Sequence, residues 1–332
     1  MERLWKIYHE EVPDFIRAMA ETPAMERLRD VGMHCGCDYT NFANHRSLIP
    51  YHRQVHSVGV ALIVWHFTRD EASSAAGLLH DIATPPFAHT VDFLKGDHLR
   101  QEATEEGTAA AIAACAPLMK ALADRGLTLD QVADYHRYPI ADNDSPRLSA
   151  DRLEYTLGSG LSYGFAHLDE LASMYRDLTV GSNEEGQPEL AFAHAEPALR
   201  FAELSMRNSR VFVSDEDRYA MQHLAEILRE ALERGVLQRE DLCKTESWVI
   251  AKLTADPAMN ERWTRFTRMS ALERRAVRPD GGDWICVNAK RRYIDPLIFG
   301  QGRVSQVFPS HRKAIDELLA QDFGVWLRGY ED

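Results

Sequence analysis

The sequence lacks the long apolar segments that insertion into a membrane requires. No stretch of its 332 residues approaches the roughly 18 consecutive apolar residues of a membrane-spanning helix. The N-terminal residues up to Phe15 are rich in charge and contain no apolar core of a signal peptide. We therefore expect a cytoplasmic protein without a membrane partner.

An excess of positive charge is also absent. The chain has 38 lysine and arginine residues against 51 aspartate and glutamate residues, which gives a formal net charge of −13. A surface of this sign repels nucleic acid and anionic membranes. We expect no stable nucleic-acid binding, while a local basic pocket for a small anion stays compatible with the sequence.

Cysteine is scarce, and its spacing forms no recognisable metal motif. Five cysteines are typical of reduced thiols in the cytoplasm. Cys35-Gly36-Cys37 is the one close pair, and it lacks a second CxxC or an HxxxH motif to complete a zinc site. The pair therefore predicts no metal site by itself.

Several motifs of common enzyme classes are missing from the chain. The sequence has no GxSxG nucleophile elbow, which argues against a serine hydrolase. It has no GxxxxGK[ST] or GxGxxG segment, so neither a P-loop nor a Rossmann nucleotide site is expected.

What the chain does contain is helical periodicity over most of its length, so we predict a mainly α fold with two small β-hairpin additions, at about 178–192 and 274–298. A helix over about 146–157 is expected to end in a Gly158-Ser159-Gly160 loop. We expect N-terminal helices and a metal-binding core in 1–175, with a helical C-terminal part in 176–332. Further helices are expected near 53–68, 71–83, 86–94, 99–115, 117–124, 128–137, 167–177, 196–209, 215–234, 245–254, 257–268 and 310–321.

Four polar residues on three of the expected helices suit a divalent metal ion. They are His56, His80, Asp81 and Asp151. Two imidazoles and two carboxylates bind Mn, Mg, Fe, Ni or Zn and do not select among them. Each residue also has a plain structural interpretation: a core histidine, a helix cap or half of an ion pair. Spacing alone leaves these alternatives open.

Longer motifs favour the metal site, because five stretches resemble one known family in order and spacing. They are Thr22–Arg29 (TPAMERLR), Arg53–Val60 (RQVHSVGV), Leu79–His89 (LHDIATPPFAH), Asp151–Tyr155 (DRLEY) and Arg292–Pro296 (RYIDP). They resemble the HD superfamily of metal-dependent phosphohydrolases, whose core pattern is H…HD…D. The likeness is greatest to the branch of dNTP triphosphohydrolases that contains the dGTPase-like and the SAM-and-HD-domain proteins.

The resemblance implies a fold and a set of roles. The fold would be a helical HD-domain core, with His56, His80, Asp81 and Asp151 as ligands of one divalent metal ion. Arg53 would contact phosphate or organise the site.

The same resemblance gives roles to residues around the metal. Tyr155 would contact the substrate. His89 would be catalytic, with Asp92 one helical turn later to orient or charge its imidazole. A helix N-terminal polar residue is the plain alternative for His89.

The chain also departs from this family. Thr84 stands where the family has a second histidine, and Gln101 stands where a catalytic histidine precedes a glutamate. We therefore expect Thr84 and Gln101 on the substrate side and His98, three residues before Gln101, as a catalytic residue; the sequence leaves open whether His98 replaces the missing histidine. The resemblance therefore implies a retained metal site and an altered triphosphate machinery.

Two further features have less specific interpretations. His136 precedes the helix of Asp151, and we expect a plain loop residue there, with a position at the pocket as the alternative. The basic segment Lys290, Arg291 and Arg292 is expected to be a solvated cluster at a β-edge, with phosphate contact as its alternative.

The function expected from the resemblance is hydrolysis of a nucleotide or a related phosphate ester by a metal-activated water. One alternative is a phosphatase or phosphodiesterase for a nucleoside monophosphate or a cyclic nucleotide. Another is a nucleotide-sensing regulatory protein with little turnover. The resemblance also implies a homo-oligomer.

Overall fold

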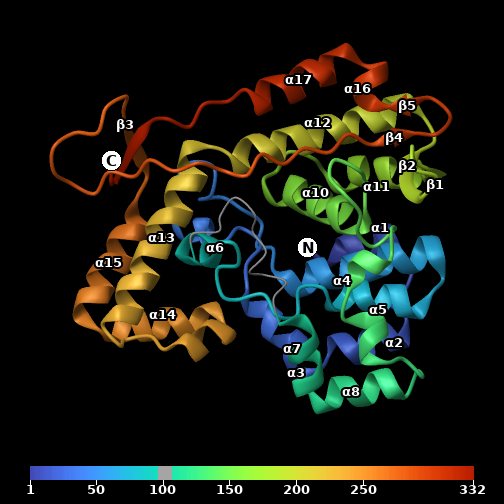
Figure 1. The fold of residues 1–332 in the computed structure, drawn as a ribbon, viewed down its shortest axis with the longest axis horizontal. Helices are drawn as coiled ribbons and strands as arrows, with labels where there is room; N and C mark the ends of the chain where they lie inside the picture. The colour runs from blue at the N-terminus through green and yellow to red at the C-terminus, as the bar shows by residue number, and fades with distance from the viewer. Residues whose placement is uncertain (96–106) are drawn as a thin grey trace.

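The computed structural model describes residues 1–95 and 107–332 (Figure 1). Helices dominate these residues, and the strands are few and short, so the prediction of a mainly α fold is confirmed. None of the described helices is both long and apolar enough to cross a membrane. Cytoplasmic location, homo-oligomer formation and the two-part division near residue 175 stay predictions.

The helices follow one another closely along the chain. The first ten are α1 (Trp5–Tyr8), α2 (Asp14–Ala20), α3 (Pro23–Glu26), α4 (Arg53–Thr68), α5 (Glu71–Leu79), α6 (Thr90–Lys95), α7 (Thr108–Ala114), α8 (Ala116–Ala123), α9 (Leu129–Val132) and α10 (Ala150–Ser162). The others are α11 (Leu168–Arg176), α12 (Ala195–Phe212), α13 (Asp215–Glu233), α14 (Glu246–Ala255), α15 (Pro257–Arg268), α16 (Val304–Val307) and α17 (Pro309–Leu319). Short 3-10 helices are η1 (Glu2–Leu4), η2 (Arg27–Asp30), η3 (Cys37–Tyr39), η4 (Tyr135–Arg137) and η5 (Arg239–Cys243).

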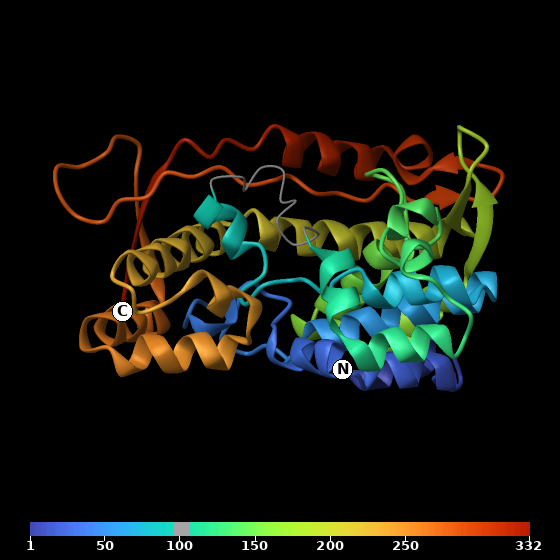
Figure 2. The same cartoon turned by 60° about the horizontal axis from the view of Figure 1, so that its bottom comes forward.

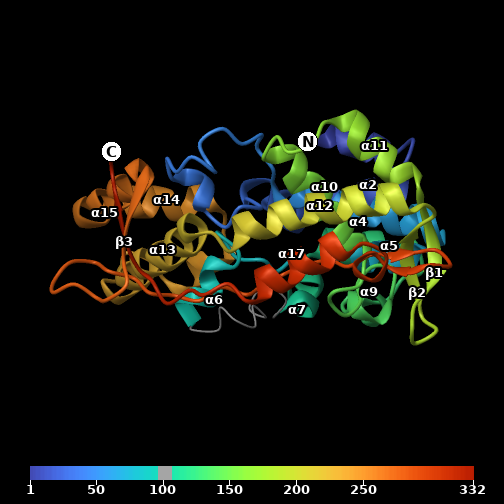
Figure 3. The same ribbon diagram turned by 90° about the horizontal axis from the view of Figure 1, so that it is seen from above.

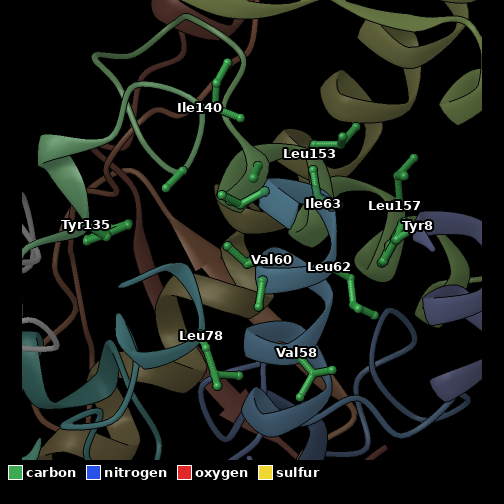
Figure 4. Packing of buried hydrophobic residues seen from close by; sticks show 14 of the residues in the cluster. Tyr8, Val58, Val60, Leu62, Ile63, Leu78, Tyr135, Ile140, Leu153 and Leu157 are labelled. Atoms are coloured by element: carbon green, nitrogen blue, oxygen red, sulfur yellow. The ribbon is translucent and has the colours of Figure 1, made fainter. Parts of the chain in front are cut away.

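Helices α4 and α5 pack directly against each other inside the larger hydrophobic core. The side chain of Asp70 begins α5 by accepting the backbone N–H groups of Ala72 and Ser73. Gly77 lets the two helices approach closely, because a Cβ atom there would lie 3.2 Å from Val60. Figure 4 shows this core, in which α4 packs against both α5 and α10.

Helix α10 continues through the segment that was expected to be a loop. Gly158 and Gly160 are both helical, so the loop prediction was wrong. A Cβ atom on Gly158 would overlap the ring of Tyr51, and one on Gly160 would lie 2.8 Å from Leu204. These glycines allow close packing against α10, a reason that local backbone preference does not reveal.

The expected hairpin over 178–192 is present. Strands β1 (Leu178–Ser182) and β2 (Pro188–Phe192) pair antiparallel. Strand β2 also pairs in parallel with β4 (Leu297–Ile298), which pairs with β5 (Gly302–Arg303). This sheet therefore joins the hairpin to the C-terminal part of the chain.

The pairing expected within 274–298 was wrong. Strand β3 (Ala271–Arg275) pairs antiparallel with the C-terminal strand β6 (Trp326–Tyr330). Ile285 forms only an isolated bridge to Leu327. Leu327 is fully buried, and its pairing with segments distant in sequence outweighs the hairpin turn that Asp280-Gly281-Gly282 favours. The two sheets lie at opposite ends of the molecule (Figures 1 and 3).

Two large hydrophobic clusters and one small one form the interior of the described part of the chain. The larger one contains the packed faces of α4, α5, α10 and α12. The second lies around α13, α14 and α15 and includes Cys35, Cys37 and Phe87 from the N-terminal half. Helix α17 lies along α12 near the top of the view in Figure 2. Long-range contacts thus connect both halves of the sequence around the cavity described below.

Candidate metal centre and its cavity

Three elements bring the candidate ligands together. Helix α4 carries His56 on its first turn, and His80 and Asp81 directly follow α5. Asp151 lies in the first turn of α10, whose N-terminus is capped when the side chain of Ser149 accepts the backbone N–H of Arg152. The packing of α4 against α5 and α10 therefore fixes the positions of these side chains.

Two imidazoles and one carboxylate face a common point. Nε2 of His56 lies 3.2 Å from Nε2 of His80 and 3.0 Å from Oδ1 of Asp151. Nε2 of His80 lies 3.7 Å from the same oxygen. An ion held at about 2.0–2.2 Å places neighbouring ligand atoms about 3.0–3.5 Å apart. The spacing of these three atoms fits a shared metal ion.

Hydrogen bonds at the opposite ring nitrogens favour the same conclusion. Nδ1 of His80 lies 2.7 Å from the carbonyl oxygen of Gly77, which can only accept, so Nδ1 carries the proton and leaves a lone pair on Nε2. Nδ1 of His56 likewise donates to a carboxylate oxygen of Glu154 at 2.6 Å. When each Nδ1 carries the only ring proton, the two Nε2 lone pairs face each other across 3.2 Å, and a cation between them stabilises this arrangement.

Glu154 is a site residue that the sequence interpretation missed. Its side chain is fully buried, and it also accepts hydrogen bonds from the hydroxyl groups of Tyr8 and Tyr51. A Cβ atom on Gly59 would lie 2.6 Å from the Glu154 side chain, so the glycine leaves room for it. The available signal was its spacing, because a residue three positions after Asp151 lies on the same face of the helix.

Asp81 lies next to His80 and is held by two hydrogen bonds of its own. Its Oδ2 lies 3.5 Å from Nε2 of His80 and 2.6 Å from the guanidinium of Arg53. Thr84 donates its hydroxyl to the other oxygen at 2.7 Å. A carboxylate oxygen has lone pairs for both an arginine and a metal ion. Thr84 is fully buried and does not line the cavity, so it orients Asp81 in this arrangement.

The charges at the centre shift the pKa values of its members. Although burial opposes the charged form, the carboxylates of Asp151 and Glu154 raise the pKa of His56 to about 10. Burial also opposes ionisation of Asp151, but the His56 contact lowers its pKa to about 2. The pKa of Asp81 is held well below its usual range by Arg53, against the effect of burial. Without a metal, a proton on His56 supplies the positive charge that these carboxylates require.

A cavity of about 610 Å³ opens beside the centre. Arg53 and Tyr155 line it, as expected for substrate-side residues. The basic segment Lys290, Arg291 and Arg292 lines it too and lies outside any strand, so the β-edge interpretation was wrong. The remaining lining includes His34, Cys35, His89, Phe93, Tyr135, His136, Asp142, Arg152, Tyr163, Phe212 and Asp217.

His136 faces this cavity and is paired with a carboxylate. Its Nδ1 lies 2.9 Å from Asp142, whose other oxygen accepts from Arg152 at 2.6 Å. The plain-loop interpretation of His136 therefore understated its surroundings. The signal for its position is tertiary, since η4 is brought to the cavity by contact with α5.

His89 and Asp92 form a second pair at the cavity. Nδ1 of His89 lies 2.9 Å from Oδ2 of Asp92, which is fully buried. Burial lowers the pKa of His89, and the positive charge of Arg292 lowers it further. Phe87 and Ala88 adopt positive φ angles of 61° and 45° just before His89. Such backbone strain is typical of segments that position functional groups.

Two of the expected site residues, His98 and Gln101, lie outside the described residues. The others, namely Arg53, His56, His80, Asp81, Thr84, His89, Asp92, Asp151 and Tyr155, all belong to the metal centre, its supporting contacts or the cavity wall.

Comparison with known proteins adds distant relatives of this chain. The chain matches no protein-family model. It is 23% identical over 310 residues to the metal-dependent phosphohydrolase cns2 of Cordyceps militaris, which covers 90% of this chain and 84% of that protein. It is 26% identical over 248 residues to the uncharacterized protein YdhJ of Bacillus subtilis, over 74% of each chain.

Solved structures share the architecture. A phosphohydrolase from Bacteroides thetaiotaomicron matches with a TM-score of 0.62 and 14% identity over 95% of each chain. The fold is one found in a known phosphohydrolase. A hypothetical protein from Aquifex aeolicus also matches with a TM-score of 0.62 and 17% identity, over 97% of this chain and 93% of that one.

Proposed function

We propose that this protein is an HD-type, metal-dependent phosphohydrolase that acts on a nucleotide. One observation carries the proposal: Nε2 of His56, Nε2 of His80 and Oδ1 of Asp151 converge beside a cavity with a basic wall. The similarity to the metal-dependent phosphohydrolase cns2 and to the Bacteroides thetaiotaomicron phosphohydrolase supports the same reaction class.

His56, His80 and Asp151 would hold the divalent ion, with Asp81 as the fourth protein ligand. When bound, such an ion acidifies a water molecule and polarises a phosphoryl oxygen. Glu154 holds the ring of His56 in place, and Arg53 holds the carboxylate of Asp81. These supporting contacts keep the ligand atoms converged before a substrate arrives.

The cavity wall suits a polyanionic substrate in a protein that is otherwise acidic. Lys290, Arg291 and Arg292 would bind phosphate oxygens. Arg152 is fixed by its hydrogen bond to Asp142 and adds positive charge close to Asp151. The partly buried Tyr155 would contact the sugar or the base. A volume of about 610 Å³ falls in the range of small-molecule sites.

His89 would transfer a proton to the leaving oxygen. Asp92 orients its ring through the hydrogen bond at Nδ1, which leaves Nε2 for the substrate. Burial and Arg292 disfavour the protonated imidazole in the free protein. The negative charge of a bound phosphate offsets this effect and raises the pKa of His89 when the substrate is present.

A phosphate-release assay over dNTPs, NTPs, nucleoside monophosphates and cyclic nucleotides, combined with metal analysis, tests this proposal. Replacement of Asp151 by asparagine is expected to lower metal affinity and turnover by more than about 100-fold. Loss of a residue that only supports a metal ligand lowers them by about 10- to 100-fold. Asp130→Asn is the control, because Asp130 is exposed on α9. If Asp151→Asn keeps full metal content and full turnover, the proposal is wrong.

A monophosphate or a cyclic nucleotide is the alternative substrate. One contact favours it: Thr84, at the position of a family histidine, donates to Asp81 and does not face the cavity. Release of product from monophosphates or cyclic nucleotides alone would select this alternative. Thermal stabilisation by nucleotides without any product would instead indicate a nucleotide-sensing protein.

A further inference from the structure

Three buried metal-ligating side chains meet outside the centre described above. The sulfur of Cys37, a ring nitrogen of His45 and a carboxylate oxygen of Asp217 lie within 4.8 Å of one another. Cys37 begins η3, His45 lies in the turn that follows it, and Asp217 lies in the first turn of α13. The cluster joins the segment before α4 to a helix far along the chain.

His45 is the first sign that this cluster is incomplete. Both of its ring nitrogens are buried and have no hydrogen-bond partner among the described residues. Its Nε2 lies 3.7 Å from Oδ1 of Asp217, which is too far for a hydrogen bond. Buried polar atoms nearly always have a partner, because an unsatisfied one costs about 1–3 kcal/mol. A ligand between the imidazole and the carboxylate would satisfy both.

The surroundings of Asp217 also indicate that the cluster is incomplete. Its side chain is almost completely buried, and in the described part of the chain no lysine or arginine lies within ion-pair distance of it. The thiol of Cys37 lies 3.7 Å from the backbone carbonyl oxygen of Asp217. A buried carboxylate without a cationic partner is unfavourable, and a metal ion would supply the missing positive charge.

Two cavities border this cluster. Asp217 lines the cavity of about 610 Å³ beside the candidate metal centre. His45 lines a separate cavity of about 360 Å³ that is bounded by residues of the segment before α4. Cys37 lines neither cavity and lies between them in the second hydrophobic cluster. A buried metal site needs an entry path, for which these cavities are the candidates.

We propose that Cys37, His45 and Asp217 bind a second metal ion of the zinc class. A thiolate, an imidazole and a carboxylate are ligands that zinc accepts, and in a tetrahedral site they lie about 3.3–3.8 Å apart. The three ligand atoms, now within 4.8 Å of one another, therefore need only a small movement to bind one ion. The second oxygen of Asp217 or a water molecule completes the coordination. The ion fastens the segment before α4, which carries His34 and Cys35 at the cavity, to α13.

Cobalt(II) is the probe for this site, because it replaces zinc and reports thiolate ligation in its absorption spectrum. The metal-free full-length protein is loaded with cobalt(II). We expect a thiolate-to-cobalt charge-transfer band in the near ultraviolet, and displacement of the band by zinc(II). Cys37→Ser is expected to abolish the band and to lower the bound metal by about one ion per chain. His56, His80 and Asp151 offer no sulfur, so an ion at the candidate catalytic centre cannot produce this band.

Cys35→Ser is the matched control, because Cys35 is a buried thiol two residues away that is not part of the cluster. It should keep the band. Asp217→Asn keeps the thiol and should weaken cobalt binding, so it tests the site even if Cys37→Ser fails to fold. Absence of the band in the folded wild-type protein, or its loss in Cys35→Ser alone, would overturn the second site. Neither result depends on turnover, so the proposed function is tested separately.

Discussion

Nδ1 of His56 lies 2.6 Å from a carboxylate oxygen of Glu154, a residue with no exposed surface. The contact leaves Nε2 of His56 directed at Asp151 and His80. A carboxylate behind a histidine fixes its tautomer and makes it a better metal ligand. Glu154 thus connects the interior of α10 to the chemistry at the cavity.

Replacement of Glu154 by glutamine is expected to weaken metal binding by about 10- to 100-fold, with a parallel loss of activity. The amide retains one acceptor but loses the negative charge that polarises His56. Titration calorimetry on the metal-free protein measures the affinity. Glu203→Gln is the control, since Glu203 is exposed on α12. Unchanged affinity in Glu154→Gln would contradict a supporting role for this residue.

Replacement of His89 by glutamine is expected to lower kcat by about 10²- to 10⁴-fold while the metal content stays the same. His194→Gln is a matched control, because His194 also pairs with an aspartate, Asp177, but is 79% exposed. A loss of bound metal in His89→Gln would show that the residue acts through the centre and not through proton transfer.

The pH dependence of turnover should identify His89 as an acid. Activity that requires the protonated imidazole falls as pH rises through the pKa of His89. That pKa is lowered in the free protein by burial and by Arg292, so the fall in kcat/KM lies at lower pH than the fall in kcat, which reports the phosphate-bound complex. The pH profiles of kcat/KM and kcat, measured for the wild-type protein and for His89→Gln, give the difference between these two pH values. A coincident fall in both profiles would contradict the proposed effect of the bound phosphate.

Gly158→Ala should destabilise the protein although it lies inside a helix. At an exposed helical position the change stabilises by about 1 kcal/mol. Here the new methyl group would overlap the ring of Tyr51, so we expect a net loss of about 1–3 kcal/mol. Chemical denaturation measures it. Gly77→Ala in α5 is the graded comparison, because its Cβ atom would lie 3.2 Å from Val60, a tight contact that a small shift relieves, so its loss of stability should be smaller. A more stable Gly158→Ala variant would show that Tyr51 moves aside freely.

Glu246 should make stability depend on pH. Its carboxylate accepts the backbone N–H groups of Gly32 and Phe87 and the hydroxyl of Tyr39. Burial, together with the nearby charge of Asp38, raises its pKa from 4.5 to about 7. The folded state therefore holds this proton more tightly than the unfolded state. Stability from Glu246 is complete below about pH 4.5 and is lost as pH rises to about 7.

Glu246→Gln is expected to flatten this part of the pH dependence, by about 1–3 kcal/mol between pH 5 and pH 7.5. Urea denaturation at the two pH values measures the change in the free energy of unfolding for each protein. The contributions of the other titrating groups are the same in both proteins, so they cancel when the two changes are subtracted. An equal slope in the wild-type protein and the variant would exclude Glu246 as its source.

The sequence by itself indicated most of the helices, and its resemblance to a known family supplied the four candidate metal ligands. Helix α4 begins at Arg53 and ends at Thr68, as predicted, because its apolar periodicity is long and uninterrupted. The motif HD…D selected residues that the fold brings within a few ångströms of one another. Local patterns carry this information because the spacing along each helix decides which side chains share a face.

Only the tertiary structure decided the partners of those residues. Glu154 behind His56, Arg53 beside Asp81 and Asp217 beside Cys37 all depend on how separate elements pack. Strand β3 likewise pairs with β6, which the nearby Gly281-Gly282 turn did not indicate. In each case the deciding term is burial of charge or apolar surface between segments distant in sequence, and no local spacing records it.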